Sequence, residues 1–263
     1  MLDDTPALRH HDVGHVRVIT LARPERRNPL GDATISELRE ALRGAEGNAR
    51  VRVLVLAADG PAFCAGLDLR DLATAADGPM EHHQASASAL GDLFAALVGS
   101  RLPIVAAVQG PAVGGGVGLV LAADVAVMAA GATLRFSEVR LGFVPALVAV
   151  LLVRHAGEKA TRDLLLRAAP LSATDAARLG LVNEVSADGD ALARALVLAA
   201  EIAENAPAAV AATKRLLISL RSLALEHGLR SAADVNAAAR ATSTLREGLA
   251  AFQERREPEW GDV

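Results

Sequence analysis

Two glycine-bearing loops constrain the fold of this chain more than any other feature: residues 63–68 (Phe-Cys-Ala-Gly-Leu-Asp) and residues 110–118 (Gly-Pro-Ala-Val-Gly-Gly-Gly-Val-Gly). Each loop follows an apolar run rich in β-branched residues, at 51–56 and 104–108, and each leads toward a stretch of helical character. Glycine lets the backbone turn tightly and approach a ligand, and a helix start leaves N–H groups unpaired. The pattern predicts a strand, a glycine turn and a helix, formed twice. Two such turns facing one another would clamp an oxygen that gains negative charge.

The rest of the first 190 residues alternates between predicted strands and helices, which is typical of an α/β fold. We expect further strands at 15–21, 124–128 and 133–136, and helices at 32–43, 85–98, 115–122 and 173–179. Asp32 is the expected N-cap of the first helix, and Ser172 with Asp175 resembles a capping box. Residues 73–81, which contain a Gly-Pro pair, are expected to form a flexible surface loop.

From residue 191 onward the pattern is helical. Pro207 suits the first turn of a helix that runs past Leu220, and two more helices are expected at 230–241 and 245–256. The sequence therefore predicts two parts: an α/β core at 1–190 that carries the site, and a helical oligomerisation subdomain at 191–263.

Composition excludes several classes of partner. The net charge of −4 and the lack of a Lys/Arg-rich block argue against nucleic acid or an anionic membrane surface, and the chain has no Tyr for stacking on bases. No run reaches the ~18 apolar residues of a membrane helix. The apolar run 145–153 is expected to be a buried helix, and residues 1–6 lack the features of a signal peptide. Cys64, the only cysteine, is expected to be a buried apolar residue, which fits a reducing, cytoplasmic location.

The glycine loops do not match nucleotide-binding motifs. No Lys-Ser or Lys-Thr pair follows the second loop, so it is not a P-loop. The residues after Gly118 are Leu119, Val120 and Leu121, which breaks the dinucleotide fingerprint at its third glycine.

The two loops, together with residues 136–142, 173–182 and 246–252, resemble the crotonase family, the enoyl-CoA hydratases and isomerases, in order and approximate spacing. The resemblance implies a crotonase-like spiral of ββα units with a C-terminal helical subdomain that packs between subunits of a trimer or hexamer. It implies an acyl-CoA thioester substrate. No metal or redox cofactor is implied, since CoA is part of the substrate.

The resemblance also implies roles for individual residues. The backbone N–H groups of Leu67 and Gly115 would hold the thioester oxygen while it becomes enolate-like. Glu138 would act as general acid and base, because it lies in an apolar segment where burial raises a carboxyl pKa. The alternative for Glu138 is a structural salt bridge to Arg135 or Arg140.

Further residues are expected to bind the acyl-CoA by the same resemblance: Ala65, Gly66, Asp68, Gly114, Arg26 and Arg255. A solvated surface arginine is the alternative for both Arg26 and Arg255. The adjacent His82 and His83 are expected to be exposed in a variable loop rather than to bind metal.

The chain departs from the family at Gly118, where two-glutamate hydratases carry their first glutamate. The segment Ser137–Ala146 looks like the methylglutaconyl-CoA hydratase branch. We expect an enzyme that adds or removes water across the α,β double bond of an enoyl-CoA by a single glutamate. The alternatives are a Δ3-Δ2 enoyl-CoA isomerase and a non-catalytic acyl-CoA-binding subunit.

Overall fold

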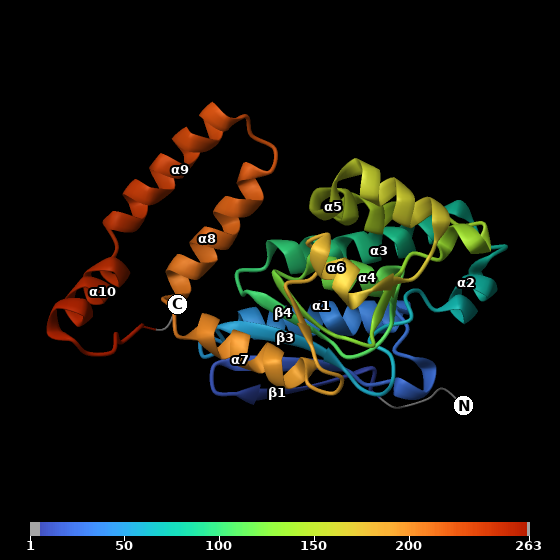
Figure 1. Ribbon diagram of the computed structural model, residues 1–263, viewed down its shortest axis with the longest axis horizontal. Coiled ribbons are helices and arrows are strands. Elements are labelled where there is room, and N and C mark those ends of the chain that lie inside the picture. Colours follow the sequence, from blue (N-terminus) through green and yellow to red (C-terminus); the bar gives the residue numbers. More distant parts are fainter. Residues whose placement is uncertain (1–5, 262–263) are drawn as a thin grey trace.

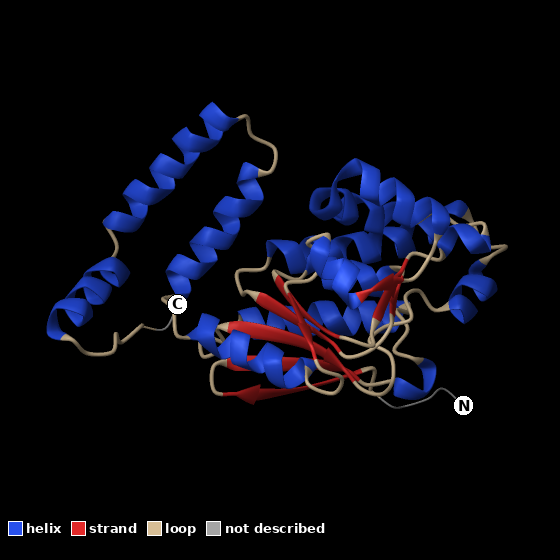
Figure 2. Cartoon of the chain, in the orientation of Figure 1, coloured by secondary structure: helices blue, strands red, loops and turns tan. Residues whose placement is uncertain are grey.

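The computed structural model describes residues 6–261. Residues 1–6, where we expected no signal peptide, lie almost entirely outside this range. Two sheets form the centre of the molecule (Figure 2). The larger has the order β1 (Leu8–Val13), β2 (Val16–Leu21), β3 (Val53–Ala58), β4 (Ile104–Val108), β6 (Val125–Ala129) and β9 (Glu184–Ser186), with β1 antiparallel and the others parallel. The smaller has the order β5 (Ala112–Val113), β7 (Thr133–Arg135) and β8 (Leu171–Ser172).

Helices cover both faces of the larger sheet (Figure 1). One face is covered by α1 (Asp32–Glu46), α3 (Met80–Gly99) and α4 (Gly115–Ala122), and the other by α7 (Ala191–Ala203). Strand β4 is buried along its whole length, as expected for a parallel strand with both faces covered. The remaining elements of the core are η1 (Pro24–Arg26), α2 (Leu69–Ala75), η2 (Glu138–Leu141), α5 (Ala146–Arg167) and α6 (Ala173–Arg178).

Helix α7 belongs with the sheet, although it lies inside the segment 191–263 that we expected to be separate. Ala191, Ala195 and Ala199 are fully buried against the strands. They are four residues apart and so lie on one face of α7, and their small side chains let the helix approach the sheet closely. The helices that project from the core are α8 (Pro207–Leu220), α9 (Leu225–Arg240) and α10 (Ser243–Glu254), which we call the C-terminal arm (Figure 1). The functional division at residue 190 stays a prediction.

A buried lysine ties the arm to the core. The ammonium of Lys214 on α8 is 2.7 Å from Asp124 Oδ2 and donates to the Leu102 carbonyl at 3.0 Å. Asp124 also accepts from the backbone N–H of Ile104 at 2.8 Å, so one carboxylate joins α8 to the start of β4.

Most predicted elements are present, and the errors have local causes. Strand 104–108 and helix 115–122 have the predicted bounds, and Ser172 caps α6 by accepting from the N–H of Asp175 at 3.1 Å. The N-cap of α1 is Gly31 and not Asp32, which is the first helical residue. Strand β1 was not predicted, because five of its six residues are exposed and no apolar alternation marks it.

One prediction about helices was wrong and another was right only in part. Residues 73–81 are not one loop, since α2 ends at Ala75 and α3 begins at Met80. The apolar run 145–153 does form the start of α5, but only one of its faces is buried, and Val150 is 52% exposed.

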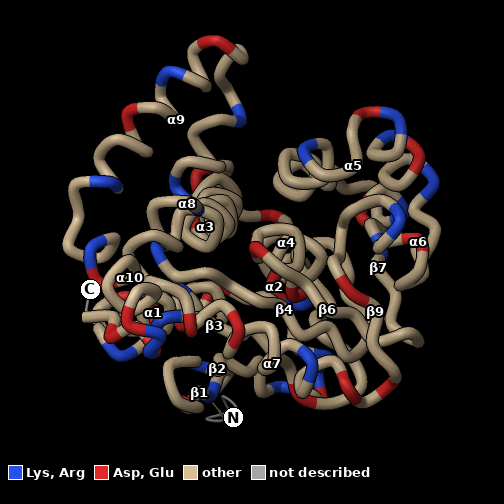
Figure 3. Tube along the Cα trace, turned by 60° about the vertical axis from the view of Figure 1, so that its left-hand side comes forward, with Lys and Arg blue, Asp and Glu red and all other residues tan. Residues whose placement is uncertain are grey.

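Basic and acidic residues are both found along helices such as α5 and α9 (Figure 3). Between residues 6 and 261 no single helix is long and apolar enough to cross a membrane. Helices α7 and α8 reach the length and apolar composition of a membrane span only when they are taken together, and the two are bent by 106° relative to one another.

Candidate active site

The two glycine loops lie side by side, joined by backbone hydrogen bonds. The N–H of Val113 donates to the carbonyl of Cys64 at 2.9 Å, and the N–H of Phe63 donates to that of Pro111 at 3.1 Å. On the other side of the first loop, Leu30 donates to the Gly66 carbonyl at 2.7 Å and accepts from the Asp68 N–H at 3.3 Å. This parallel bridge directs the Leu67 N–H away from Leu30.

At two positions in these loops glycine is required by a positive φ as well as by lack of space. Gly66 has φ +83°, and a Cβ there would lie 2.5 Å from the Val113 carbonyl oxygen. Gly114 has φ +51°, and a Cβ there would lie 2.7 Å from Glu138 Oε1. The glycines therefore let the loops approach one another and let the Glu138 carboxylate rest against the second loop.

Leu67 and Gly115 both line one cavity. Among the hydrogen bonds of residues 6–261, neither of their backbone N–H groups has an acceptor. Gly115 is the first residue of α4, where the N–H groups have no partner within the helix and the helix dipole is positive. Since a Cβ on Gly66 would be 3.3 Å from the Gly115 nitrogen, the two loops are in direct contact. Such a pair of donors can hold one carbonyl oxygen.

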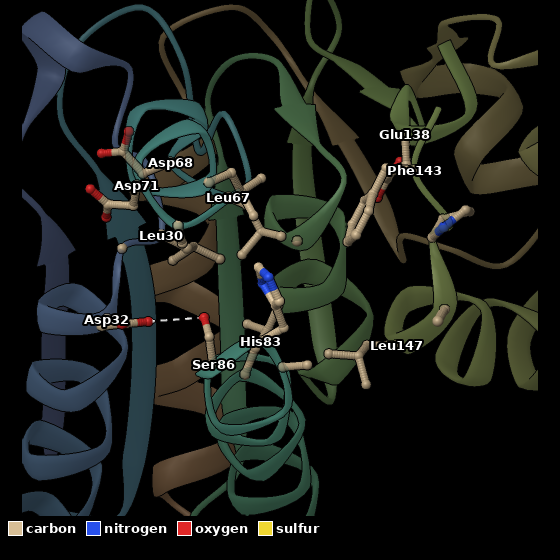
Figure 4. A pocket seen from close by; sticks show the side chains of 18 of the residues that line it. Leu30, Asp32, Leu67, Asp68, Asp71, His83, Ser86, Glu138, Phe143 and Leu147 are labelled. Atoms are coloured by element: carbon tan, nitrogen blue, oxygen red, sulfur yellow. Dashed lines mark hydrogen bonds between the residues drawn. The ribbon is translucent and has the colours of Figure 1, made fainter. Parts of the chain in front are cut away.

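Glu138 lies on the opposite wall of this cavity, at the start of η2 (Figure 4). Its Oε2 atom is buried and has no hydrogen-bond partner among the described residues. Burial raises the pKa of this carboxyl above its ordinary value, and a hydrogen bond from its own backbone N–H opposes part of the rise. The alternative of a salt bridge is wrong for the described chain: Glu138 makes none, and Arg135 donates instead to the Ala168 carbonyl at 3.2 Å. An unpaired carboxylate of raised pKa can take up and release a proton.

The cavity that contains these groups has a volume of about 250 Å³. Its wall is mostly apolar and comes from the first loop, α2, α3 and the start of α5. The apolar side chains of the wall are those of Leu30, Leu67, Leu72, Ala75, Ala87, Leu90, Phe143, Val144, Pro145, Ala146, Leu147 and Val148. The polar side chains are those of Asp32, Asp68, Asp71, His82, His83, Ser86 and Glu138.

The space beside Gly118 is filled by an aromatic ring. A Cβ on Gly118 would lie only 2.2 Å from Cζ of Phe94, whose ring comes from α3 and is buried. The glutamate that the resemblance would place at this position therefore has no room. The sequence shows that the glutamate is absent at position 118, but it does not show that the ring of Phe94 fills the space. Phe94 and Gly118 meet only because α3 packs on α4.

The other residues expected to bind acyl-CoA occupy varied positions. Asp68 is buried, caps α2 by accepting from the Arg70 N–H at 3.0 Å, and is ion-paired with Arg26. Ala65 lines a separate cavity of about 360 Å³ beside the loops. Arg255 is exposed at the end of α10 and does not line the cavity of Glu138. Contacts of these residues with CoA stay predictions.

The expectation for the two histidines was wrong in part. His82 and His83 lie on the first turns of α3, not in a loop, and both line the cavity. His83 is half-buried and shares one face of the helix with Ser86 and Leu90, at the spacing i, i+3 and i+7 (Figure 4). That spacing could have identified the face, but the Gly-Pro pair before it favoured a loop. Cys64 is buried as expected, and burial raises the pKa of its thiol to about 12.

Comparison with known proteins identifies the family. Residues 12–263 match the family model described as enoyl-CoA hydratase/isomerase. A Thermus thermophilus protein named "Putative enoyl-CoA hydratase" is 46% identical over 245 residues, 93% of this chain and 97% of that protein. The 2,3-dehydroadipyl-CoA hydratase of Escherichia coli is 31% identical over 93% of this chain and 94% of its own length.

Solved structures agree. The crystal structure of an enoyl-CoA hydratase from Polaromonas sp. JS666 superimposes with a TM-score of 0.92 and 32% identity, covering 97% of this chain and 99% of that one. The match extends through the core and the C-terminal arm. This chain is a member of the enoyl-CoA hydratase/isomerase family of enzymes and has the crotonase fold.

Proposed function

We propose that this protein adds water across the α,β double bond of an enoyl-CoA thioester, or forms that bond in the reverse reaction by removing water. Glu138 would be the only acid and base. The observation that carries the proposal is the buried Oε2 of Glu138, which has no partner among the described residues and shares one cavity with two unpaired N–H groups. Burying a carboxylate without a partner costs folding free energy, and groups of this kind are concentrated at functional sites.

The proposed reaction needs one proton to move twice. Glu138 takes a proton from water as the oxygen attacks the β-carbon, and the electrons of the double bond move to the thioester oxygen. The N–H groups of Leu67 and Gly115 stabilise this enolate, and one such donor contributes roughly 3 kcal/mol to lowering a barrier. Glu138 then returns the proton to the α-carbon. Both steps use groups of this chain and the acyl-CoA, so no metal or redox cofactor is needed.

The test is Glu138→Gln, which keeps the size of the side chain and removes the base. Turnover of trans-2-hexenoyl-CoA should fall by at least ~100-fold, while affinity for a saturated acyl-CoA changes by no more than a few-fold. The matched control is Glu158→Gln, since Glu158 is 74% exposed on α5 and lies outside the cavity wall. Near-normal turnover of the Glu138→Gln enzyme would remove Glu138 from the mechanism.

A second function, Δ3-Δ2 enoyl-CoA isomerisation, is favoured by the ring of Phe94. It fills the space beside Gly118, so no second carboxylate can hold a water molecule there. Isomerisation needs only one base, which moves a proton between two carbons of the acyl chain. Assay of 3-hexenoyl-CoA beside trans-2-hexenoyl-CoA separates the two functions: an isomerase converts the first and leaves the second unhydrated.

We also propose that the protein is a homotrimer or a hexamer. In support, the C-terminal arm exposes apolar side chains that a monomer would leave in water, among them Leu217, Leu225, Leu229, Leu249 and Phe252. Light scattering of the purified protein would measure the mass directly. The cytoplasmic location stays a prediction from the sequence.

A further inference from the structure

We propose that the cavity accepts an uncharged, apolar acyl chain and discriminates against an acyl chain that ends in a carboxylate. The inference rests on the proposed function, because it takes the cavity of Leu67, Gly115 and Glu138 as the acyl site. It concerns the walls of that cavity and not the reacting groups.

The first observation is the sign of the charges in the wall. Four carboxylates line the cavity, those of Asp32, Asp68, Asp71 and Glu138, and no Lys or Arg is among the lining residues. Arg26 and Arg23 both lie near enough to act on the Asp71 carboxyl, but neither lines the cavity, and the Arg26 guanidinium is already paired with Asp68. A carboxylate that entered the cavity would lose water without gaining a cation, which is unfavourable.

The second observation is that three of the four acidic residues, Asp32, Asp68 and Asp71, lie together. In Figure 4, Asp68 and Asp71 lie on the far side of Leu67 from Glu138, and Asp32 accepts a hydrogen bond from Ser86 at 3.1 Å below them. A Cβ on Gly31 would lie 2.6 Å from Asp71 Oδ2 and 3.9 Å from Asp68 Cβ, so the two aspartates are close neighbours. Burial raises the pKa of the Asp71 carboxyl, Asp68 and Asp32 raise it further, and Arg26 and Arg23 lower it. An added carboxylate would be repelled by the same acidic side chains.

The rest of the wall suits a hydrocarbon. Leu72 and Leu90 come from α2 and α3, and Leu147 and Val148 come from α5, so apolar side chains of three helices surround the space. His83 and Ser86 can each offer a hydrogen bond, but a hydroxyl does not cancel the charge of a carboxylate. His83 is labelled in Figure 4 and lines the cavity, and the experiment tests separately whether its imidazole holds a carboxylate.

The proposal sets this chain apart from one relative and from one branch of the family that a segment of it resembles. The Escherichia coli relative at 31% identity is named for 2,3-dehydroadipyl-CoA, whose acyl chain ends in a carboxylate. Methylglutaconyl-CoA, the substrate of the branch that the segment Ser137–Ala146 resembles, also carries a free carboxylate. On this proposal the chain differs from both in the acyl group that it accepts.

The primary test is binding of two saturated thioesters, hexanoyl-CoA and adipyl-CoA, measured by calorimetry. They differ only in a terminal methyl or carboxylate, and neither has a double bond, so the result does not depend on turnover. One like charge at contact distance in water is equivalent to a roughly fivefold change in Kd. With several carboxylates in the wall, we expect adipyl-CoA to bind at least ~10-fold more weakly. Equal affinities would overturn the proposal.

Variants identify the cause. Asp71→Asn removes one charge without changing the shape, and should narrow the ratio of the two Kd values at least ~2-fold. Asp77→Asn removes a charge outside the cavity wall and should leave the ratio as in the wild type. An unchanged ratio in the Asp71→Asn protein would refute the role of the acidic wall. Tight adipyl-CoA binding that is lost in His83→Gln would show that His83 holds the carboxylate, and would also overturn the proposal.

Turnover distinguishes this proposal from the proposed function. If trans-2-hexenoyl-CoA and 3-hexenoyl-CoA are both left unchanged while hexanoyl-CoA still binds better than adipyl-CoA, the function fails and the inference stands. If 2,3-dehydroadipyl-CoA is hydrated as fast as trans-2-hexenoyl-CoA, the function stands and the inference fails.

Discussion

The contact between Gly118 and Phe94 gives a prediction of stability that can be worked out from the structure. In Gly118→Ala, the new Cβ would lie 2.2 Å from Cζ of Phe94 and 2.8 Å from both Cε atoms. Carbon atoms in contact are normally about 3.5–4.0 Å apart, so the ring must move by more than ~1 Å. Both residues are buried, and overpacking of this kind costs about 1–3 kcal/mol.

A gain in helix propensity opposes this cost. Ala is more favourable than Gly in a helix by about 1 kcal/mol, so the net destabilisation of Gly118→Ala should be roughly 0–2 kcal/mol. Gly44→Ala is the matched control, because Gly44 lies in α1, is exposed and would have no atom within 4 Å of an added Cβ. That variant should be stabilised by about 1 kcal/mol. The difference between the two variants isolates the overpacking.

The assay is urea denaturation. The free energies of unfolding are compared between variants that share the same m-value, the dependence of that free energy on urea concentration. The double variant Gly118→Ala/Phe94→Leu should recover part of the loss, because leucine does not reach as far as the ring tip. Equal stabilisation of Gly118→Ala and Gly44→Ala would refute the reasoning. If the contact is as described, Gly118→Glu would not restore a second catalytic carboxylate, since the larger side chain meets the same ring and carries a charge into the core.

The remaining predictions concern Glu138, Lys214 and Gly66. Because burial raises the pKa of Glu138, the native state retains its proton to higher pH than the unfolded chain, so stability falls as pH rises from about 4.5 through the native pKa. The free energy of unfolding, measured in urea from about pH 4 to 7, should fall for the wild type relative to Glu138→Gln as the pH rises. The same pH dependence in both proteins would contradict the burial of Glu138. Lys214→Ala leaves the partly exposed Asp124 without its ammonium partner and should lower stability by about 1–3 kcal/mol, with earlier proteolytic cleavage of the arm, whereas the exposed Lys159→Ala should do neither. Gly66→Ala places a Cβ 2.5 Å from the Val113 oxygen at φ +83°, so turnover should be lost; full activity would show that the two loops do not need this close approach.

Local patterns allowed much of the core to be predicted. The bounds of β4 and α4 follow from a short apolar run, a glycine turn and a helix start, and Ser172 caps α6 by a contact three residues along the chain. Strand β1 could not be found in this way, since its residues are mostly exposed and it is held by pairing with β2.

The candidate site shows the same limit. The glycine loops and Glu138 were identified from the sequence because they resemble a family pattern, and family membership is confirmed by the comparisons. The faces of α2 and α3 toward the cavity were not predicted. The Gly-Pro pair before α3 suggested a loop, so the helical spacing of His83, Ser86 and Leu90 was not recognised.

The sequence by itself determined that this chain forms an α/β core with two glycine turns and a helical C-terminal segment. Rules for turns, caps and periodicity act over a few residues, so they can be read along the chain. Only the tertiary structure decided that the Glu138 carboxylate rests against Gly114, that Phe94 fills the space beside Gly118, and that acidic residues share the cavity wall. Each of these contacts joins segments far apart in sequence, and the packing of helices on the sheet, not any local pattern, sets which side chains meet.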